Sequence, residues 1–62
     1  MDLIEVLKFE NNGKQYICKA NGIKIRNNNG ALEYLKGIVK GKEVWCLPYF
    51  DNLWLESEYK EA

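Results

Sequence analysis

Apolar and polar residues alternate in the two segments that flank Asn21-Gly22. An asparagine–glycine dipeptide between alternating segments is the strongest short-range signal for a β-hairpin. As a two-residue turn, it places Cys18 opposite Ile25 and separates two faces: Tyr16, Cys18, Ala20, Ile23 and Ile25 on one, and Gln15, Ile17, Lys19, Lys24 and Arg26 on the other. The pattern predicts an antiparallel hairpin over residues 15–26 with one buried and one solvated face.

The next segment, residues 30–41, has a helical spacing of apolar residues. They recur at intervals of three and four positions: Leu32, Leu35, Ile38 and Val39. Such residues line one side of a helix. Asn28 or Asn29 can cap the start of this helix, and Gly41 can end it in a left-handed conformation. We therefore expect one helix here.

Residues 43–50 and 53–59 are rich in β-branched and aromatic residues, and Asp51-Asn52 between them is a turn signal. This predicts a second hairpin, with an edge or a bulge at Pro48 because proline cannot donate to a strand ladder. Residues 2–10 fit a helix through Leu3 and Val6, or a strand that enters Asn12-Gly13. We favour the strand, because the strand that begins at Lys14 needs a partner.

Together these elements give three strands, a helix and two more strands. This order predicts a mainly β fold with one helix (α+β), as a small five-stranded OB- or SH3-like barrel. With 62 residues, the chain has room for one domain, residues 1–62. Its 47% hydrophobic and 13% aromatic content favours a folded core over disorder.

Net charge and hydropathy limit the partners and the cellular environment that we expect for this protein. Nine basic and nine acidic residues cancel, whereas proteins that coat nucleic acid usually carry a basic excess. No apolar run approaches the ~20 residues of a membrane helix, and the acidic N-terminal segment is unlike a signal peptide. We expect a cytoplasmic protein without membrane contact. Frequent lysine and asparagine point to AT-rich coding, as in low-GC bacteria and their mobile elements.

The residues needed for most catalytic sites are missing from the sequence. The chain has no histidine, and Cys18 and Cys46 form no metal-binding motif, so we expect two reduced thiols, no metal and no cofactor. Ser-His and Cys-His dyads are excluded, and the glycines form no phosphate-binding loop. These features favour a protein that is not an enzyme.

The stretches YICKANGIKIR, ALEYLKGIVKGKEVWC and FDNLWLE resemble a degenerate staphylococcal-nuclease-like domain of the OB-fold type. The resemblance covers about residues 16–56 and implies the same barrel. Arg26 matches the arginine at the end of the family's third strand, and Asp51 matches a turn aspartate. The carboxylates of the family's catalytic loop are replaced by Asn27–Asn29, and Leu55 stands in place of a second arginine. A vestigial nuclease is therefore a hypothesis to test, and activity is not expected.

Two surfaces are candidates for binding. The first is cationic and lies on the outer face of the first hairpin: Lys14, Lys19, Lys24 and Arg26. OB-folds commonly bind oligonucleotides in this region, although such sites also use aromatic stacking. The alternative is a charged strand face that only keeps the protein soluble.

The second candidate surface is aromatic with an acidic border: Trp45, Leu47, Tyr49, Trp54, Glu56 and Glu58. Aromatic anchors with a charged rim are typical of protein-binding hot spots. This surface depends on a tight turn at residues 51–52, and the alternative is that both tryptophans belong to the core.

These features predict a small protein-binding inhibitor or adaptor of the phage or mobile-element type, one that for example blocks a host defence factor. Its partner would be a larger protein, and a homodimer through the aromatic face is a further option. The alternative function is binding of an oligonucleotide or nucleotide.

Overall fold

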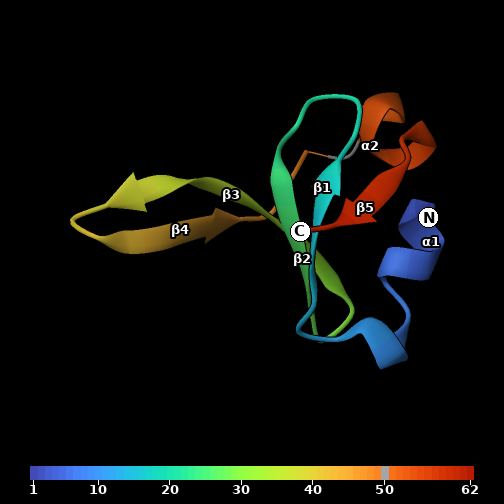
Figure 1. Cartoon of the computed structure of the whole chain (residues 1–62), viewed down its shortest axis with the longest axis horizontal. Coiled ribbons are helices and arrows are strands. Elements are labelled where there is room, and N and C mark those ends of the chain that lie inside the picture. The colour runs from blue at the N-terminus through green and yellow to red at the C-terminus, as the bar shows by residue number, and fades with distance from the viewer. Residues whose placement is uncertain (50) are drawn as a thin grey trace.

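A computed structural model describes residues 1–49 and 51–62 and shows one antiparallel sheet with the strand order β4-β3-β2-β1-β5 (Figure 1). The strands are β1 (Gln15–Cys18), β2 (Lys24–Asn28), β3 (Ala31–Val39), β4 (Lys42–Cys46) and β5 (Tyr59–Glu61). The helical elements are α1 (Leu3–Val6), the 3-10 turn η1 (Phe9–Asn11) and α2 (Asn52–Glu56). The predicted mainly β class with five strands is confirmed, whereas the sheet is not closed into a barrel.

The first hairpin forms as β1 and β2, with a longer loop than predicted. Tyr16, and not Cys18, lies opposite Ile25. The Gly22 amide donates to the Cys18 carbonyl over 2.7 Å, and the side chain of Asn21 accepts from the Ile23 amide over 2.9 Å. These bonds form a loop over residues 19–23. Because the register differs by two residues, the predicted faces are kept.

The predicted helix over residues 30–41 is wrong: this segment is strand β3 followed by a turn. Asn29 and Gly30 have φ values of 54° and 87°, and Lys40 and Gly41 have 52° and 79°. Two central residues with positive φ are what a type I′ hairpin turn requires. Each end of β3 therefore leads directly into an antiparallel neighbour.

The apolar residues of β3 have a helical spacing although they lie on a strand. Leu32 and Leu35 are three positions apart, so they point to opposite faces of the sheet. The register between β3 and β4 then shifts between Leu35 and Gly37, which leaves Lys36 as an extra residue in a β-bulge. The bulge returns Ile38 to the face of Leu35. The helical spacing of these apolar residues therefore results from their positions on both faces of a strand and from the bulge. It does not mark one side of a helix.

The predicted hairpin about residues 51–52 is also wrong, and position 50 of its first strand lies outside the described residues. Asp51 is the N-cap of α2, since its carboxylate accepts from the Trp54 amide over 3.3 Å. The chain then returns as β5, which pairs with β1.

The predicted N-terminal strand is wrong for a related reason. The edge of β1 that it would cover is occupied by β5. Residues 3–6 form α1 instead, with Asp2 as N-cap accepting from the Glu5 amide over 2.9 Å. Leu3 and Val6, three positions apart, are both buried.

The hydrophobic core lies on one face of the sheet, where both helices pack (Figure 1). It contains Leu3, Val6, Tyr16, Cys18, Ile25, Leu32, Trp54 and Tyr59. The Tyr59 hydroxyl donates to the Trp54 carbonyl over 2.6 Å, and this bond joins β5 to α2. Burial, and the Cys18 thiol beside it, raise the pKa of Tyr59, so its hydroxyl remains a donor.

Asn27 is the main polar residue inside this core, with 1% of its surface exposed. Its side-chain amide donates to the carbonyls of Val6 and Lys8, both over 3.0 Å, and its side-chain oxygen accepts from the Gly30 amide over 2.8 Å. The same residue thus holds the N-terminal helical segment and the β2–β3 turn. All three groups would lose this partner in its absence.

We expect Asn27→Ala to lower the free energy of unfolding by about 3 kcal/mol, because buried polar groups left without partners each cost about 1–3 kcal/mol. Urea denaturation measures this loss. Asn28→Ala is the matched control, since Asn28 is exposed and makes one 3.3 Å bond to Glu33. Equal losses in the two variants would contradict the role given to Asn27.

The two buried tyrosines should respond differently to loss of the hydroxyl. Tyr59→Phe removes the bond to Trp54 and should cost about 1–2 kcal/mol. The Tyr16 hydroxyl is buried and has no hydrogen-bond partner in the described residues, so Tyr16→Phe should be neutral or stabilising. Thermal or urea unfolding of both variants checks this, and a larger loss in Tyr16→Phe would refute it.

Candidate binding surfaces

One face of the sheet carries side chains that alternate with those of the core. They come from four neighbouring strands: Gln15, Ile17, Lys24, Arg26, Glu33, Leu35 and Trp45. We call this set the open face, since both helices contribute to the core on the other side. Its members are half-buried, because they pack against one another.

The centre of the open face is an arginine held between a carboxylate and an indole. The guanidinium carbon of Arg26 lies 4.4 Å from the centroid of the Trp45 ring, and its Nε donates to Glu33 Oε1 over 2.7 Å. Arg26 and Glu33 face each other on β2 and β3, whereas Trp45 reaches them from β4. The cation–π contact and the ion pair together fix the guanidinium plane.

This cluster joins the predicted cationic surface to the predicted aromatic surface, which the sequence places on different hairpins. Arg26 belongs to the predicted cationic surface and Trp45 to the predicted aromatic one, and they are in contact. Glu33 compensates the charge of Arg26, and the guanidinium covers one side of the indole. The charge available to a phosphate and the ring surface available to a base are both reduced.

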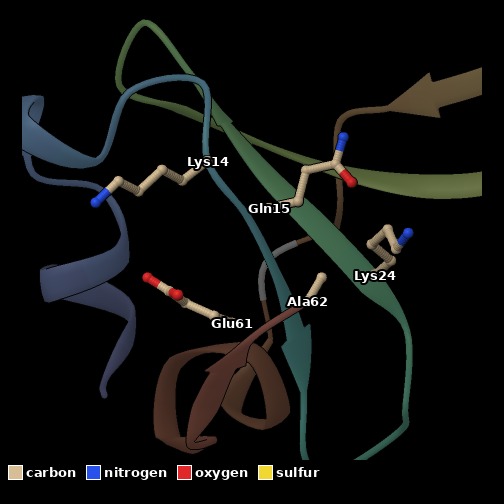
Figure 2. Close-up of a pocket in the computed structure, with 5 residues that line it drawn as sticks. All are labelled: Lys14, Gln15, Lys24, Glu61 and Ala62. Carbon is tan, nitrogen blue, oxygen red and sulfur yellow. The ribbon is translucent and has the colours of Figure 1, made fainter.

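The other predicted cations spread over different places. Lys14 and Lys24 line an open pocket of about 480 Å³ with Gln15, Glu61 and Ala62. Figure 2 shows the amino groups of Lys14 and Lys24 pointing to opposite sides of the strands, and the Glu61 carboxylate lies on the Lys14 side. Lys19 lies in the β1–β2 loop and is exposed. The structure therefore does not bring these cations together at one position where they could bind a single anion.

The predicted aromatic surface is not assembled as expected, because the hairpin that it required is absent. Trp54 is 8% exposed and belongs to the core, where its ring centroid lies 6.2 Å from that of Tyr34. Leu47 and Tyr49 are 73% and 90% exposed. Trp45 is half-buried under Arg26. The acidic border is divided as well, since it has one exposed glutamate on α2 and another before β5: Glu56 and Glu58.

The structure reveals a further exposed apolar site, in the segment whose spacing predicts a helix. Residues 31–34 of β3 pair with β2, whereas residues 34–39 pair with β4, so the segment 35–46 projects from the body as a two-stranded ribbon (Figure 1). We call this segment the β-arm. Ile38 and Val39 near its tip are 67% and 59% exposed. The Asn29-Gly30 dipeptide, a hairpin signal, could have indicated a strand here.

The sequence predicts two buried reduced thiols; both cysteines are free, but only Cys18 is buried. The buried Cys18 thiol donates to the Ser57 hydroxyl over 3.1 Å, and Cys46 is half-buried on β4. In the described part of the chain, histidine, cysteine, aspartate and glutamate nowhere gather in a group of three or more that could hold a metal ion. The helices described within residues 1–49 and 51–62 are each too short or too polar to span a bilayer.

Comparison with known proteins finds no family model, curated protein or solved structure that matches the chain. The resemblance to staphylococcal-nuclease-like domains stays a prediction. The stretch that carries most of it, residues 31–46, forms β3 and β4.

Removing the Arg26 side chain should uncover Trp45. We expect Arg26→Ala to increase acrylamide quenching of tryptophan fluorescence and to lower the free energy of unfolding by about 1 kcal/mol. Trp54 in the core contributes a component that is little quenched in both proteins. Lys19→Ala removes an exposed cation in the β1–β2 loop and should leave quenching unchanged; an equal increase there would contradict the stacking role.

Proposed function

We propose that this chain is a protein-binding module without catalytic activity, which docks on a larger protein through exposed apolar residues of the β-arm and the segment that follows it. The residues are Ile38, Val39, Leu47 and Tyr49. The observation that carries the proposal is the β-arm itself, which projects from the sheet with apolar side chains in solvent.

The physical argument starts from the weakness of an isolated hairpin. Two strands without a third strand or a helix against them are marginally stable in water. The β-arm has no such cover along residues 36–44 in the described structure, whereas at its base Trp45 stacks against Arg26 of β2. Ile38 and Val39 at the tip contribute little burial to the fold. A partner that covers them would stabilise the arm and gain the apolar area.

Leu47 and Tyr49 extend this surface toward α2. Tyrosine is enriched at binding hot spots because it combines a large ring with few rotatable bonds and a polar group. Leu53 and Leu55 on α2 are also exposed, at 43% and 56%. Exposed apolar residues thus lie at the tip of the β-arm, in the segment that follows β4 and on α2.

The size of the chain and its lysine- and asparagine-rich composition fit an inhibitor or adaptor of the phage or mobile-element type, located in the cytoplasm. We keep the OB- or SH3-like barrel as a proposal. The five antiparallel strands support it, whereas the sheet is not closed and a turn joins β3 to β4.

Oligonucleotide binding is the second candidate, favoured by the contact between Arg26 and Trp45 and by Lys24 on the same face of the sheet. Glu33 and the covered indole weigh against it. This function predicts an affinity for single-stranded oligonucleotide that falls steeply with salt and is lost in Lys24→Glu.

The variant Leu47→Ser with Tyr49→Ser should remain folded and lose its partner. Both side chains are largely exposed, so stability should change by less than about 1 kcal/mol. Loss of two anchors should weaken binding by about 30-fold or more. Affinity capture from the native cells, with the wild-type and variant chains as baits, measures this.

Phe9→Ser is the matched control, because Phe9 is 89% exposed on η1, away from the β-arm. It should capture the same proteins as the wild-type chain. The proposal fails if the double variant captures them equally well, or if the wild-type chain enriches nothing over an unrelated bait.

A further inference from the structure

In the part of the chain that the structure describes, the outer edge of β4 has no strand paired with it. β4 stands at one end of the sheet and pairs there with β3. At the other end, Met1 covers part of β5: its amino group donates to the Tyr59 carbonyl over 2.9 Å, and the Tyr59 amide donates to the Met1 carbonyl over 2.7 Å. Residues 35–39 of β3 also have an unpaired edge, but it contains the bulge at Lys36. Of the edges in the described structure, β4 therefore offers the longest regular row of unpaired backbone groups.

β4 has a geometry that can accept another strand. Natural proteins often protect an edge with a bulge, a proline or charged side chains, and β4 has charged side chains only at its first two residues, Lys42 and Glu43. Here the bulge lies on β3, at Lys36, so the five residues of β4 form a regular strand. Pro48 follows two residues after the end of β4.

The side chains of β4 would give an added strand apolar neighbours on both faces of the sheet. Val44 and Cys46 point to the side of the core, and Trp45 points to the open face. All three are half-buried, so their remaining exposed surface could be covered by side chains of an added strand.

Charge identifies the kind of segment that fits. The β-arm carries exposed lysines at positions 36, 40 and 42 and one exposed acid, Glu43, for a net charge of +2. The whole chain has a net charge of zero. Positive charge is thus concentrated at the tip, and an acidic segment would be attracted to it.

Other occupants fit less well. A second copy that paired its own β4 with this edge would bring an arm with the same positive charge, which offers no charge complementarity. A nucleic-acid strand would satisfy the lysines but would leave the backbone N–H and C=O groups of β4 without strand partners.

We propose that β4 accepts an extended acidic segment of the partner protein as a sixth strand of the sheet. Main-chain hydrogen bonds supply part of the affinity, and Lys36, Lys40 and Lys42 select acidic side chains. This inference rests on the proposed protein-binding function and specifies its mode.

Short synthetic peptides test the mode directly. The first alternates glutamate and valine, the second has lysine in place of glutamate, and the third is the acidic peptide N-methylated at two adjacent central residues. Each is added to the ¹⁵N-labelled chain, and amide shifts and hydrogen exchange are followed by NMR. We expect the acidic peptide to shift β4 amides and to slow their exchange at least tenfold. The lysine peptide should bind at least tenfold more weakly, and the N-methylated peptide should leave exchange unchanged.

Charge-reversal variants localise the effect. Lys40→Glu with Lys42→Glu should weaken binding of the acidic peptide at least tenfold. The control, Lys8→Glu with Lys19→Glu, reverses two exposed lysines outside the β-arm and should bind as the wild-type chain does.

Several outcomes would overturn the inference: no binding of the acidic peptide, equal binding of the acidic and lysine peptides, or equal protection by the N-methylated peptide. β4 amides protected without peptide, with a doubled mass in sedimentation, would show a second copy on this edge. Stronger shifts of β4 with a single-stranded oligonucleotide would assign the arm to nucleic acid. If Leu47→Ser with Tyr49→Ser still abolishes capture while the peptides fail, protein binding stands and only strand addition is refuted.

Discussion

The buried side-chain amide of Asn27 is the constraint on which the arrangement of the N-terminal half depends. It binds the carbonyls of Val6 and Lys8 and the amide of Gly30, while its own backbone pairs with the Gly13 amide and the Lys14 carbonyl. In an apolar core, these groups would each be costly without a partner. The amide thereby positions α1 over the sheet and sets the turn that directs β3. The direction of β3 in turn sends the β-arm away from the core.

The helices cover one face of a small sheet. The apolar side chains that they do not cover are buried to different extents on the open face and on the β-arm. Leu3, Val6 and Trp54 fill the core, and Tyr59 ties β5 to α2. The described residues provide few elements that could cover a second face or a long hairpin. The side chains of the open face partly cover one another, through the contacts of the arginine, glutamate and tryptophan at its centre. The β-arm has no such contacts at its tip in the described structure, and this difference is why we place the binding surface there.

The candidate site could be predicted only in part. Leu47 and Tyr49 are exposed as expected, because they leave the sheet in a connecting segment. Trp54, expected on the same surface, is buried, because an aspartate typical of turns caps a helix whose first turn directs the indole inward. Asp51 is suited to either role, and its sequence context does not choose between them. Arg26 and Trp45 are nineteen positions apart in the sequence, and only the placement of β3 between their strands brings them together.

Local sequence was enough for the features that depend on neighbouring residues: the alternating faces of β1 and β2, the turn character of Asn21-Gly22, and a chain dominated by strands. It also contains the turn at Asn29-Gly30, a signal that competes with the helical spacing of the apolar residues that follow. Packing of the whole chain decided which segment covers β1, since residues 2–10 and 59–61 compete for one edge and no local pattern ranks them. It also decided that Ile38 and Val39 lie in solvent. Their exposure follows from where the sheet ends, which is a property of the packed chain and not of the segment.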